Sequence, residues 1–423
     1  MRVHIVGAGP TGMSIAWEYA NFTDHEIIVY DKKSSVGGSW WEPSVHTRDL
    51  HSHRAIFDKA FVNTQSLFSE MGISWDKMFI NDSKNVYGTI FKSLRPNDYL
   101  KLISLSARVL LDPNVYVSVT LKDALGPMSP TGQRLVETLT YIMDGVGWNT
   151  MSAYEFVQNF NHVGLSKPQT QRVSGKVMSD AMHEALEKVG VSFVFNTELK
   201  DVEYRDDGFE ATFHNGEKVD DGLLVLCLDN NPASKLIKDN WGPNASEIVK
   251  ESAYECINVL IDYDTPIQID HTLKLSMHSE WSIVPQVLSD GKTVSCVICR
   301  LTDDILTTPP EELKLRVIEQ LGIPNKPSGI RIAWGTKWDG KRWQFHQSSG
   351  VLSTRGQVPF YGKSKNVALC GMMSHRHTPY ASIEAAVEVG RRFCQFRKPL
   401  SPILITDVLK LFIVFILLLI IQR

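Results

Sequence analysis

Runs of apolar residues divide the chain into segments that favour strands or helices. Near the N-terminus, Val3–Gly7 is a short apolar run that ends in a glycine turn, and the residues from Gly12 onward follow a helical pattern. A second apolar run, Glu26–Lys33, has the pattern of another strand. The first residues of the chain, about thirty in all, therefore predict a β-α-β unit.

Segments of the same type return in the middle and near the end of the chain. Between them lie two stretches of different character. Asn97–Arg172 is rich in helical periodicity, and Glu255–Arg300 favours antiparallel strands. The returning segments are a helix over 177–190 closed by Gly190, a strand over 191–196, a hairpin over 201–219 with an Asn215-Gly216 turn, a buried strand over 222–229, a strand over 366–373 and a helix over 377–393.

This order predicts an α/β protein in which one domain is built from separated pieces of chain. We expect a discontinuous Rossmann-like domain made of residues 1–95, 172–254 and 345–398. A second, α+β domain made of residues 96–171 and 255–344 is inserted into it. We expect the inserted domain to hold the substrate.

Composition and charge narrow the class of protein. The chain has 423 residues, a net charge of −3 and an ordinary balance of apolar and charged residues, so no basic field points to nucleic acid as a partner. Its six cysteines are too sparse for a disulfide framework and favour a reducing compartment. The sequence indicates a globular protein that works on a small molecule.

The C-terminus departs from this globular pattern. Residues 411–421 form an uncharged apolar run of eleven residues, and extension back to Ile403 gives nineteen but includes Asp407 and Lys410. Arg391, Arg392, Arg397 and Lys398 precede the segment, and Arg423 alone follows it. We predict a membrane-anchoring helix over 403–421 with the preceding domain on the cytoplasmic side. The alternative is a helix that packs on a partner or lies flat at the membrane interface.

The first glycine turn carries candidate chemistry. Gly7, Gly9 and Gly12, with Pro10 and Thr11 between them, give the pattern G-x-G-x-x-G after a strand and at the start of a helix. Such glycines allow a tight turn, close approach of backbone to a pyrophosphate and close packing of helix on strand. The helix N-terminus then offers free N–H groups to phosphate.

The end of the second strand supplies the matching groups. Asp31 stands nineteen residues after Gly12, where a carboxylate would bind the ribose hydroxyls of a dinucleotide, and Lys32 and Lys33 follow it. A second glycine pair, Gly37 and Gly38, comes next and lets the backbone pass close to a flat ligand. That additional pair is typical of flavoproteins rather than of NAD dehydrogenases.

At this point the chain resembles the FAD-dependent amine oxidase superfamily, which includes monoamine oxidases, protoporphyrinogen oxidase and phytoene desaturases. The residues from Gly7 to Gly38 match the first motif of that family without gaps. Residues 177–204 with 222–234, and then 366–393, resemble its second and third motifs. The resemblance implies noncovalently bound FAD in a GR2-type Rossmann-like domain.

The resemblance also implies roles for particular residues. Leu199 would meet the adenine, Gly371 would end the strand near the flavin, and Ser382 and Ile383 would present backbone N–H groups to the flavin ring. Four positions depart from the family pattern: His51 and Ser52 replace a Gly-Pro pair just before His53, and two more lie in the stronger motifs. Ser39 replaces an arginine after the second glycine pair, and Ala385 replaces a glycine in the last helix.

Histidines and tryptophans near these motifs are further candidates. His53 aligns with a family histidine that lies over the flavin, and we expect it to orient substrate or to tune the flavin. His46, His51 and His53 do not have the spacing of a metal site, so no metal is predicted. Cys296 and Cys299 lie on one predicted strand, where residues three apart point to opposite faces. The tryptophans of 334–343 are candidates for a substrate wall.

The combined expectation is a membrane-anchored FAD-dependent oxidoreductase that moves a hydride from a substrate C–H bond to the flavin. The substrate would be an amine or a lipophilic, isoprenoid-like molecule. One alternative is an FAD-binding protein of structural or assembly role with little catalysis, because the family lysine near the flavin is not located. A redox-neutral mutase-like or a monooxygenase-like flavoprotein is a further alternative, although no second G-x-G-x-x-G follows a strand.

Overall fold

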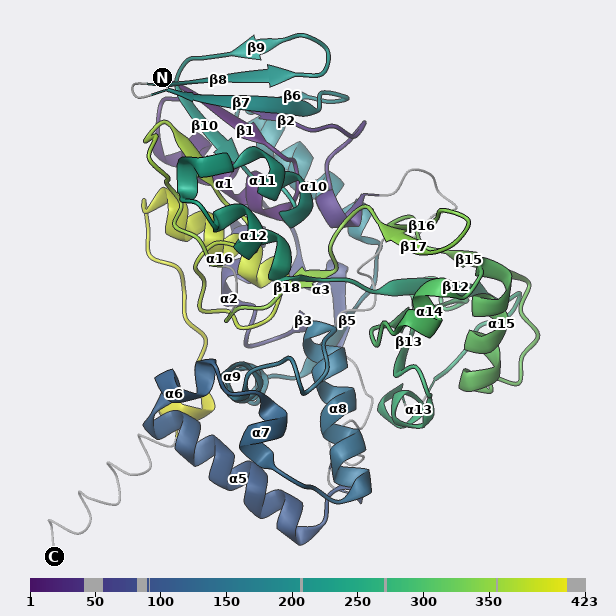
Figure 1. Ribbon diagram of the computed structural model, residues 1–423. Coiled ribbons are helices and arrows are strands. Elements are labelled where there is room, and N and C mark those ends of the chain that lie inside the picture. The colour runs from purple at the N-terminus through teal and green to yellow at the C-terminus, as the bar shows by residue number, and fades with distance from the viewer. Residues whose placement is uncertain are drawn as a thin grey trace, which may run out of the picture.

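The computed structural model describes residues 1–41, 56–81, 90, 92–205, 208–269, 272–354 and 357–408. Its chain forms a Rossmann-like body, a helical unit and a separate unit built on an antiparallel sheet (Figure 1). The expected fold class, α/β with a Rossmann-like nucleotide-binding domain, is confirmed. The predicted C-terminal helix over 403–421 falls largely outside the described residues.

The centre of the body is a parallel sheet of five strands in the order β19-β10-β1-β2-β6. Strands from three separated parts of the sequence meet here. They are β1 (Arg2–Val6), β2 (Glu26–Tyr30), β6 (Ser192–Val194), β10 (Leu223–Leu226) and β19 (Val367–Leu369).

Alternation along the strands divides the core between the two faces of the sheet. Val3 and Ile5 of β1 face the helices α1 (Pro10–Phe22), α10 (Gly175–Lys188) and α16 (Ile383–Cys394). Val6 faces the small sheet of β7 (Leu199–Arg205), β8 (Gly208–Phe213) and β9 (Lys218–Val219). Successive side chains of a strand point to opposite faces, so β1 is buried on both sides of the sheet.

Shorter elements complete the body: α2 (Val62–Glu70), α3 (Trp75–Met78), η1 (Gly38–Trp40), α11 (Asn230–Leu236), η2 (Lys238–Trp241), α12 (Ala245–Glu251), β3 (Ile56–Phe57), β4 (Phe79–Asn81), β5 (Pro168–Gln171), β11 (Ala253–Tyr254) and β18 (Gly350–Val351).

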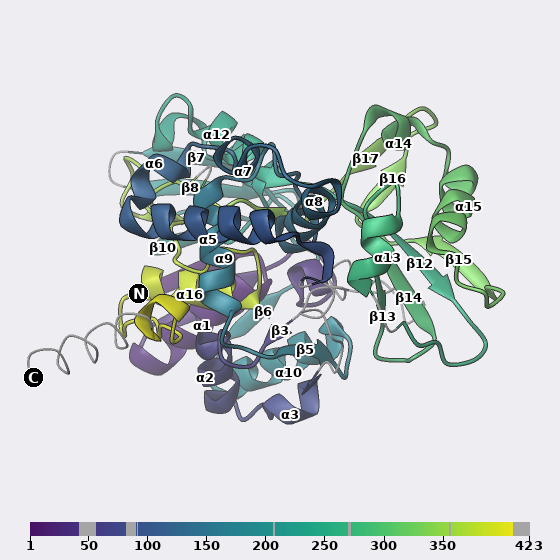
Figure 2. The same cartoon turned by 90° about the horizontal axis from the view of Figure 1, so that it is seen from below.

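The region predicted as rich in helices forms a unit with its own core. It comprises α5 (Pro96–Leu111), α6 (Pro113–Val117), α7 (Leu121–Leu125), α8 (Pro130–Asp144) and α9 (Ala153–Val163). Leu105, Leu121, Leu135 and Met151 are fully buried in it. Seen from below, α5 lies on the near side of the molecule, with α7 and α9 behind it (Figure 2).

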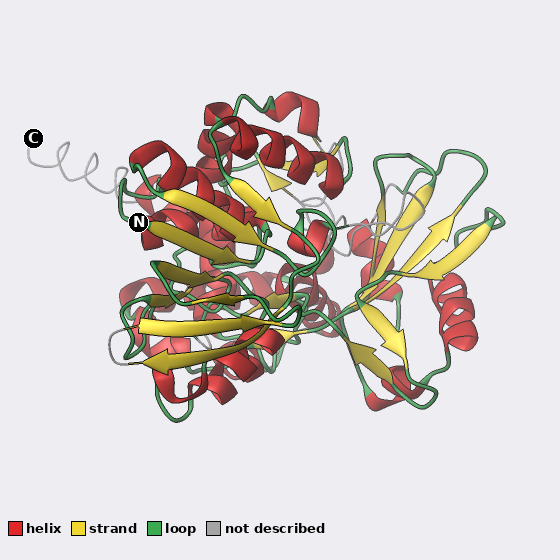
Figure 3. Ribbon diagram, turned by 90° about the horizontal axis from the view of Figure 1, so that it is seen from above, coloured by secondary structure: helices red, strands yellow, loops and turns green. Residues whose placement is uncertain are grey.

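The strand-rich region forms a second unit with a separate core. β12 (Ile257–Asp262), β13 (Ile283–Val287), β14 (Thr293–Ile298) and β15 (Gly329–Ile332) pair in the order β13-β14-β12-β15, and these strands stand apart from the body in Figure 3. Cys296 and Cys299 point to opposite faces, as predicted, since Cys299 packs with Cys256 while Cys296 lies in the core of the unit. The remaining elements are α13 (Thr272–His278), α14 (Asp303–Thr307), α15 (Pro310–Leu321), β16 (Thr336–Trp338) and β17 (Trp343–Phe345).

The end of the described chain is tied to the body and to the helical unit. Arg397 forms ion pairs with Glu18 of α1 and Glu70 of α2. Farther on, the amide of Thr406 donates to the side chain of Asn161, 3.0 Å away in α9. No helix within the described ranges is both long and apolar enough to cross a membrane, and residues 409–423 lie outside those ranges.

Candidate functional site

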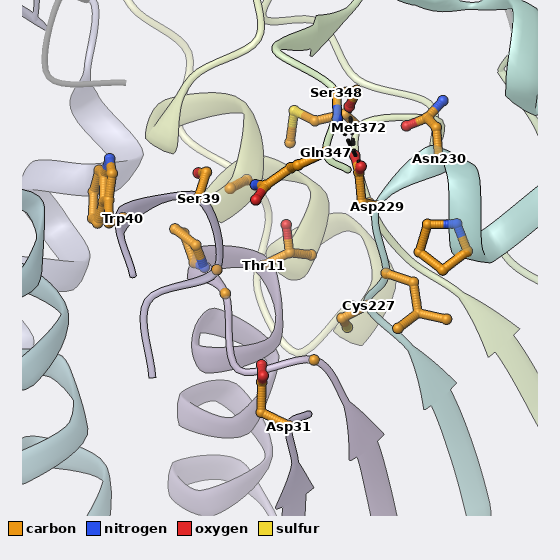
Figure 4. Close-up of a pocket in the computed structure, with 18 of the residues that line it drawn as sticks. Thr11, Asp31, Ser39, Trp40, Cys227, Asp229, Asn230, Gln347, Ser348 and Met372 are labelled. Atoms are coloured by element: carbon orange, nitrogen blue, oxygen red, sulfur yellow. Dashed lines mark hydrogen bonds between the residues drawn. The ribbon is translucent and has the colours of Figure 1, made fainter. Parts of the chain in front are cut away.

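A cavity of about 360 Å³ lies at the carboxyl ends of strands β1, β2, β10 and β19 and reaches the start of α16. Ligands of open parallel α/β sheets bind at this edge. Figure 4 shows side chains from the first and middle parts of the chain converging on the cavity with Gln347 and Ser348 from the segment before β18. Of the residues predicted from the sequence, those lining it are Gly7, Gly9, Pro10, Thr11, Asp31, Lys32, Lys33, Gly38, Ser39, Leu199, Gly371, Ser382 and Ile383.

The three glycines of the first turn differ in how much space surrounds them: a side chain would fit at Gly9 but not at Gly7 or Gly12. A Cβ on Gly7, whose φ is +114°, would overlap the carbonyl oxygen of Cys227, and a Cβ on Gly12 would overlap that of Gly7. These two glycines are required by the fold itself. A Cβ on Gly9 would meet only the Cα of Gly38, at an ordinary 3.5 Å. Gly9 lines the cavity, so a requirement for glycine there would come from a bound pyrophosphate.

The second glycine pair packs directly on the first turn. Gly37 and Gly38 both have positive φ, and a Cβ on Gly38 would lie 2.8 Å from the Cα of Gly9. The amide of Gly37 donates to the carbonyl of Ala8 over 3.0 Å. Gly12 and Gly37 thus shape the two turns without lining the cavity, whereas Gly38 and Ser39 line it.

Asp31 is held in place by backbone amides. One carboxylate oxygen accepts from the amide of Ala8 at 2.7 Å, and the other accepts from the amide of Lys33 at 2.8 Å. Burial raises the pKa of Asp31, and these two hydrogen bonds oppose the rise. Each oxygen can accept a further hydrogen bond, so the carboxylate is oriented to receive the two hydroxyls of a ribose.

The ammonium of Lys33 brings a positive charge to the second glycine pair. Its Nζ donates to the carbonyl of Gly38 at 2.7 Å and lies 4.2 Å from the ring centre of Trp334. Burial lowers the pKa of Lys33 to about 8, against the favourable charge of Asp31. The cation therefore lies beside Ser39, the position at which the resembling family has arginine. Lys32 is more exposed, and its Nζ lies 3.5 Å from Glu198.

Leu199 closes the end of the cavity near Asp31. It begins β7, after a turn in which Asn196 has a φ of +55° and the amide of Thr197 donates to the carbonyl of Asp31 at 2.9 Å. Leu199 is buried, and with Glu198 it forms part of the wall. This end of the cavity, apolar beside a ribose-binding carboxylate, fits an adenosine.

The start of α16 forms the opposite end. Ser382 caps the helix by accepting from the amide of Ala385 at 3.2 Å, and Ile383 and Ala386 line the cavity next to it. Helix N-termini stabilise negative charge. The helix predicted from residue 377 begins instead at Ile383, because the cap is Ser382 and the preceding residues are extended or bent. Ala385 is fully buried without the family's glycine.

Two lining residues that hold the segment before β18, Asp229 and Ser348, were not identified from the sequence. Asp229, three residues after the end of β10, accepts from both the amide and the hydroxyl of Ser348 and so fastens the segment before β18 to the sheet (Figure 4). Its position at the carboxyl end of a buried strand was the available signal. Trp334 also lines the cavity, and its buried indole Nε1 has no hydrogen-bond partner within the described part of the protein. An acceptor on a bound ligand would satisfy this donor.

Other residues that the sequence predicts to be functional lie outside the cavity or outside the described residues. His53, with His46 and His51, falls outside the described residues, and the described ranges contain no cluster of three or more metal-binding side chains. Among the predicted substrate-wall tryptophans, Trp334 lines the cavity, whereas Trp343 is buried in the core of the sheet unit and Trp338 packs against that core. In the described cavity wall the lysines are Lys32 and Lys33, which both follow Asp31 at the end of β2.

Comparisons with known proteins agree with this geometry. Residues 164–395 match the family described as flavin containing amine oxidoreductase, and residues 5–60 match an NAD(P)-binding Rossmann-like domain. A comparison with curated proteins found no match.

Solved structures share the fold across most of the chain. A putrescine oxidase bound to putrescine matches with a TM-score of 0.66 at 15% identity, over 93% of this chain and 98% of that one. Cyclohexylamine oxidase from Brevibacterium oxydans matches with a TM-score of 0.63 at 13% identity over the same shares. An oxidoreductase from Methanosarcina mazei, also at 0.63, is 12% identical over 93% and 100%. Since the family match covers more than half of the sequence, this chain belongs to the flavin-containing amine oxidoreductases and is an FAD-dependent oxidoreductase.

Proposed function

We propose that this oxidoreductase oxidises a lipophilic amine. The observation that carries the proposal is that the α16 N-terminus shares one end of the cavity with apolar side chains, and that Asp31 lies at the other end. Trp40, Ile56, Met372, Tyr380 and Ile383 form this apolar end. Such a wall suits a substrate with a large apolar body.

FAD, when bound, would supply the two-electron chemistry, which is the removal of a hydride from the C–H bond next to the substrate nitrogen. The nitrogen lone pair becomes the new C=N bond, so the amine is oxidised by two electrons. The amide groups at the start of α16, at Ser382 and Ile383, would stabilise the negative charge that the flavin then carries. The glycine turns and Asp31 would hold the adenosine diphosphate half in place.

The apolar wall would also set the protonation state of the substrate. A primary amine is mostly an ammonium ion in water, and that form has no lone pair to give. Burial among Trp40, Ile56 and Tyr380 lowers the pKa of an amine and favours its neutral, reactive form. The same residues exclude water from the reacting atoms.

We further propose that the protein is held at a membrane by residues 403–421. The support is the uncharged run 411–421, which directly follows the described end of the chain. Arg391, Arg392 and Arg397 are bound to carboxylates within the body, so of the four basic residues before the segment only the exposed Lys398 keeps its sequence-based role.

The experiment is a visible spectrum of the full-length protein, followed by anaerobic titration with candidate donors. We expect a flavin spectrum that a long-chain primary amine bleaches and that putrescine, a short polar diamine, bleaches far more slowly. A polyene would be the third donor. If only the polyene reduced the flavin, the substrate would be isoprenoid-like and not an amine.

Gly9→Ala is the matched control, because it is expected to keep the fold while obstructing the pyrophosphate site. It should show neither the flavin spectrum nor bleaching. A bound flavin that no donor reduces would favour a structural or assembly role instead of catalysis. Faster reduction by putrescine than by the long-chain amine would contradict the lipophilic substrate.

A further inference from the structure

Helix α5 presents two apolar faces, and only one of them is covered by the described part of the chain. Leu105 and Val109 are fully buried in the helical unit, and the carboxylate of Asp98 on the same side accepts from Ser129. The opposite side carries Leu100 and Ile103, which are 66% and 65% exposed. A helix at the surface of a globular protein normally has polar residues there.

The exposed apolar residues follow helical spacing. Leu100, Ile103, Ala107 and Leu111 are three or four positions apart, so they form one stripe along the outside of α5. Leu111 is 85% exposed. The stripe continues into α6, where Val115 and Val117 are exposed. We name these residues, together with Leu110, the α5 surface; the helix that carries most of it faces the viewer in Figure 2.

Basic residues border this stripe. Lys101 and Arg108, seven positions apart, lie on the same flank of α5. The guanidinium of Arg108 donates to the carbonyl of Ala124 at 3.0 Å, and Lys101 donates to the carbonyl of Pro127, so neither charge is neutralised by these contacts. Over residues 90–111 the sequence has four basic residues and one acidic residue, the buried Asp98.

An apolar stripe with a basic flank is the pattern of a helix that lies on an anionic membrane surface. A second copy of the chain fits less well, because a two-fold contact through this stripe would bring the cations of both copies together. The described C-terminal stretch also ends on the helical unit. Ile405 packs against Gly164, and the apolar run 411–421 follows a few residues later.

We propose that the α5 surface docks on an anionic phospholipid bilayer, with Leu100, Ile103, Ala107 and Leu111 entering the interface. Lys101 and Arg108 then meet the lipid phosphates and carboxylates. This contact is independent of the proposed reaction, so the flavin-free variant Gly9→Ala should bind vesicles as the unmodified protein does. Failure of the lipid contact and failure of the amine oxidation are therefore separate results.

The test places a polarity-sensitive fluorophore on the full-length chain at Ala107→Cys and adds phosphatidylcholine vesicles that contain phosphatidylserine. We expect the emission to shift to the blue and to brighten several-fold. The control is the same fluorophore at Leu315→Cys, since Leu315 is 60% exposed on α15 of the sheet unit. That probe should not respond. Unsubstituted protein treated with the same reagent corrects for native cysteines.

Substitutions then separate the apolar and charged contributions. Leu100→Glu with Leu111→Glu should lower the vesicle-bound fraction and suppress the Ala107→Cys signal, whereas Leu315→Glu should do neither. Lys101→Gln and Arg108→Gln should each weaken binding to the anionic vesicles by about fivefold at low salt. A silent probe at Ala107→Cys on vesicle-bound protein would overturn the proposal. So would a probe signal that rises with protein concentration without lipid, because that result indicates a second copy.

Discussion

The hydroxyl of Tyr380 lies 2.9 Å from Nδ1 of His162 and joins a wall of the cofactor cavity to the last turn of α9 in the helical unit. Burial raises the pKa of Tyr380, so the phenol keeps its proton. Burial lowers the pKa of His162 to about 4. The neutral imidazole therefore accepts from the phenol and carries its own proton on Nε2. Tyr380 also stacks on Phe61, which fixes its ring at the edge of the cavity.

This pair predicts a loss of stability in mild acid. An unfolded histidine takes up a proton near pH 6.5, while folded His162 does so only near pH 4, so the unfolded state binds more protons between these values. The contribution of His162 is complete above pH 6.5 and falls as the pH drops toward 4, by about 3 kcal/mol in total. The measurement is the free energy of unfolding of the wild type and of His162→Asn from pH 7.5 to 4.

Asparagine cannot be protonated in this range, so the difference between the two proteins isolates the histidine from the carboxylates. We expect the wild type to lose more stability than His162→Asn as the pH falls. Parallel pH profiles for the two proteins would rule out a neutral, buried His162.

The two glycines of the first turn should respond differently to alanine. Gly12→Ala places a Cβ on the carbonyl of Gly7 and should destabilise the protein, with a lower thermal midpoint even when FAD is absent. Gly9→Ala has an ordinary contact with Gly38 and should leave that midpoint nearly unchanged. It should instead raise the dissociation constant of FAD by at least about tenfold, because its Cβ enters the pyrophosphate site. Equal effects of both substitutions on the midpoint would contradict this division.

These glycines also show which part of the site the sequence could predict. Gly7, Gly12 and Gly37 are required by steric contacts within a short stretch of chain or by positive φ, and such local demands are visible as a motif. Asp229 and Ser348 are 119 positions apart, and their contact depends on how the sheet unit returns to the body. The position of Trp334 also depends on how the chain returns from the sheet unit to the body. The sequence could therefore mark Trp334 only as one of several tryptophans that are candidates for lining the cavity.

Boundaries were predicted less well than elements, for a related reason. The sequence predicts one hairpin over 201–219 with the Asn215-Gly216 turn, whereas in the structure this turn joins β8 to the short β9, and β7 and β8 pair with each other along most of their length. A turn motif specifies a local reversal and not which strands are long. The two predicted pieces of the inserted domain likewise form separate cores, because their apolar residues face inward within each piece.

Trp334→Phe tests whether the indole donor, which has no hydrogen-bond partner among the described residues, serves the cofactor. Phenylalanine keeps an aromatic ring beside Lys33 but removes Nε1–H, whose partner would be an oxygen of FAD. We expect the FAD dissociation constant to rise by roughly five- to tenfold, in line with one lost hydrogen bond of about 1 kcal/mol. Trp338→Phe, in the same unit but away from the cavity, is the control. Equal affinity in the wild type and Trp334→Phe would show that the indole does not contact FAD.

Lys33 should make FAD binding depend on pH. Its pKa of about 8 in the free protein means that it is charged below pH 8 and becomes neutral above it, and only the charged form attracts the pyrophosphate. The dissociation constant of FAD, measured by flavin fluorescence, should therefore rise above pH 8 by up to about tenfold per pH unit. Lys33→Met should bind more weakly at pH 7 and lose this dependence, while Lys32→Met should keep it. An unchanged pH profile in Lys33→Met would remove Lys33 from the pyrophosphate site.

A buried group of charges should control how firmly the end of the chain is held. Glu18 is fully buried on α1, where it accepts from Arg397 at 3.0 Å and lies 3.5 Å from Nε of the equally buried Arg391. Glu18→Gln leaves two guanidinium groups with Glu70 as their remaining carboxylate, and a buried charge without its partner costs about 3–5 kcal/mol.

We expect Glu18→Gln to lower the thermal midpoint of flavin release by several degrees. It should also speed hydrogen exchange at Leu400, whose amide donates to Asn63 beside Arg391, because Arg397 precedes that contact in the chain. Glu203→Gln is the matched control, since Glu203 forms an exposed ion pair with Arg205 on the β7–β8 hairpin. It should change neither measurement. If Glu18→Gln lowered the midpoint but left exchange at Leu400 unchanged, the cluster would stabilise the body without holding the C-terminal stretch, and that stretch would depend on Asn63 and Asn161 instead.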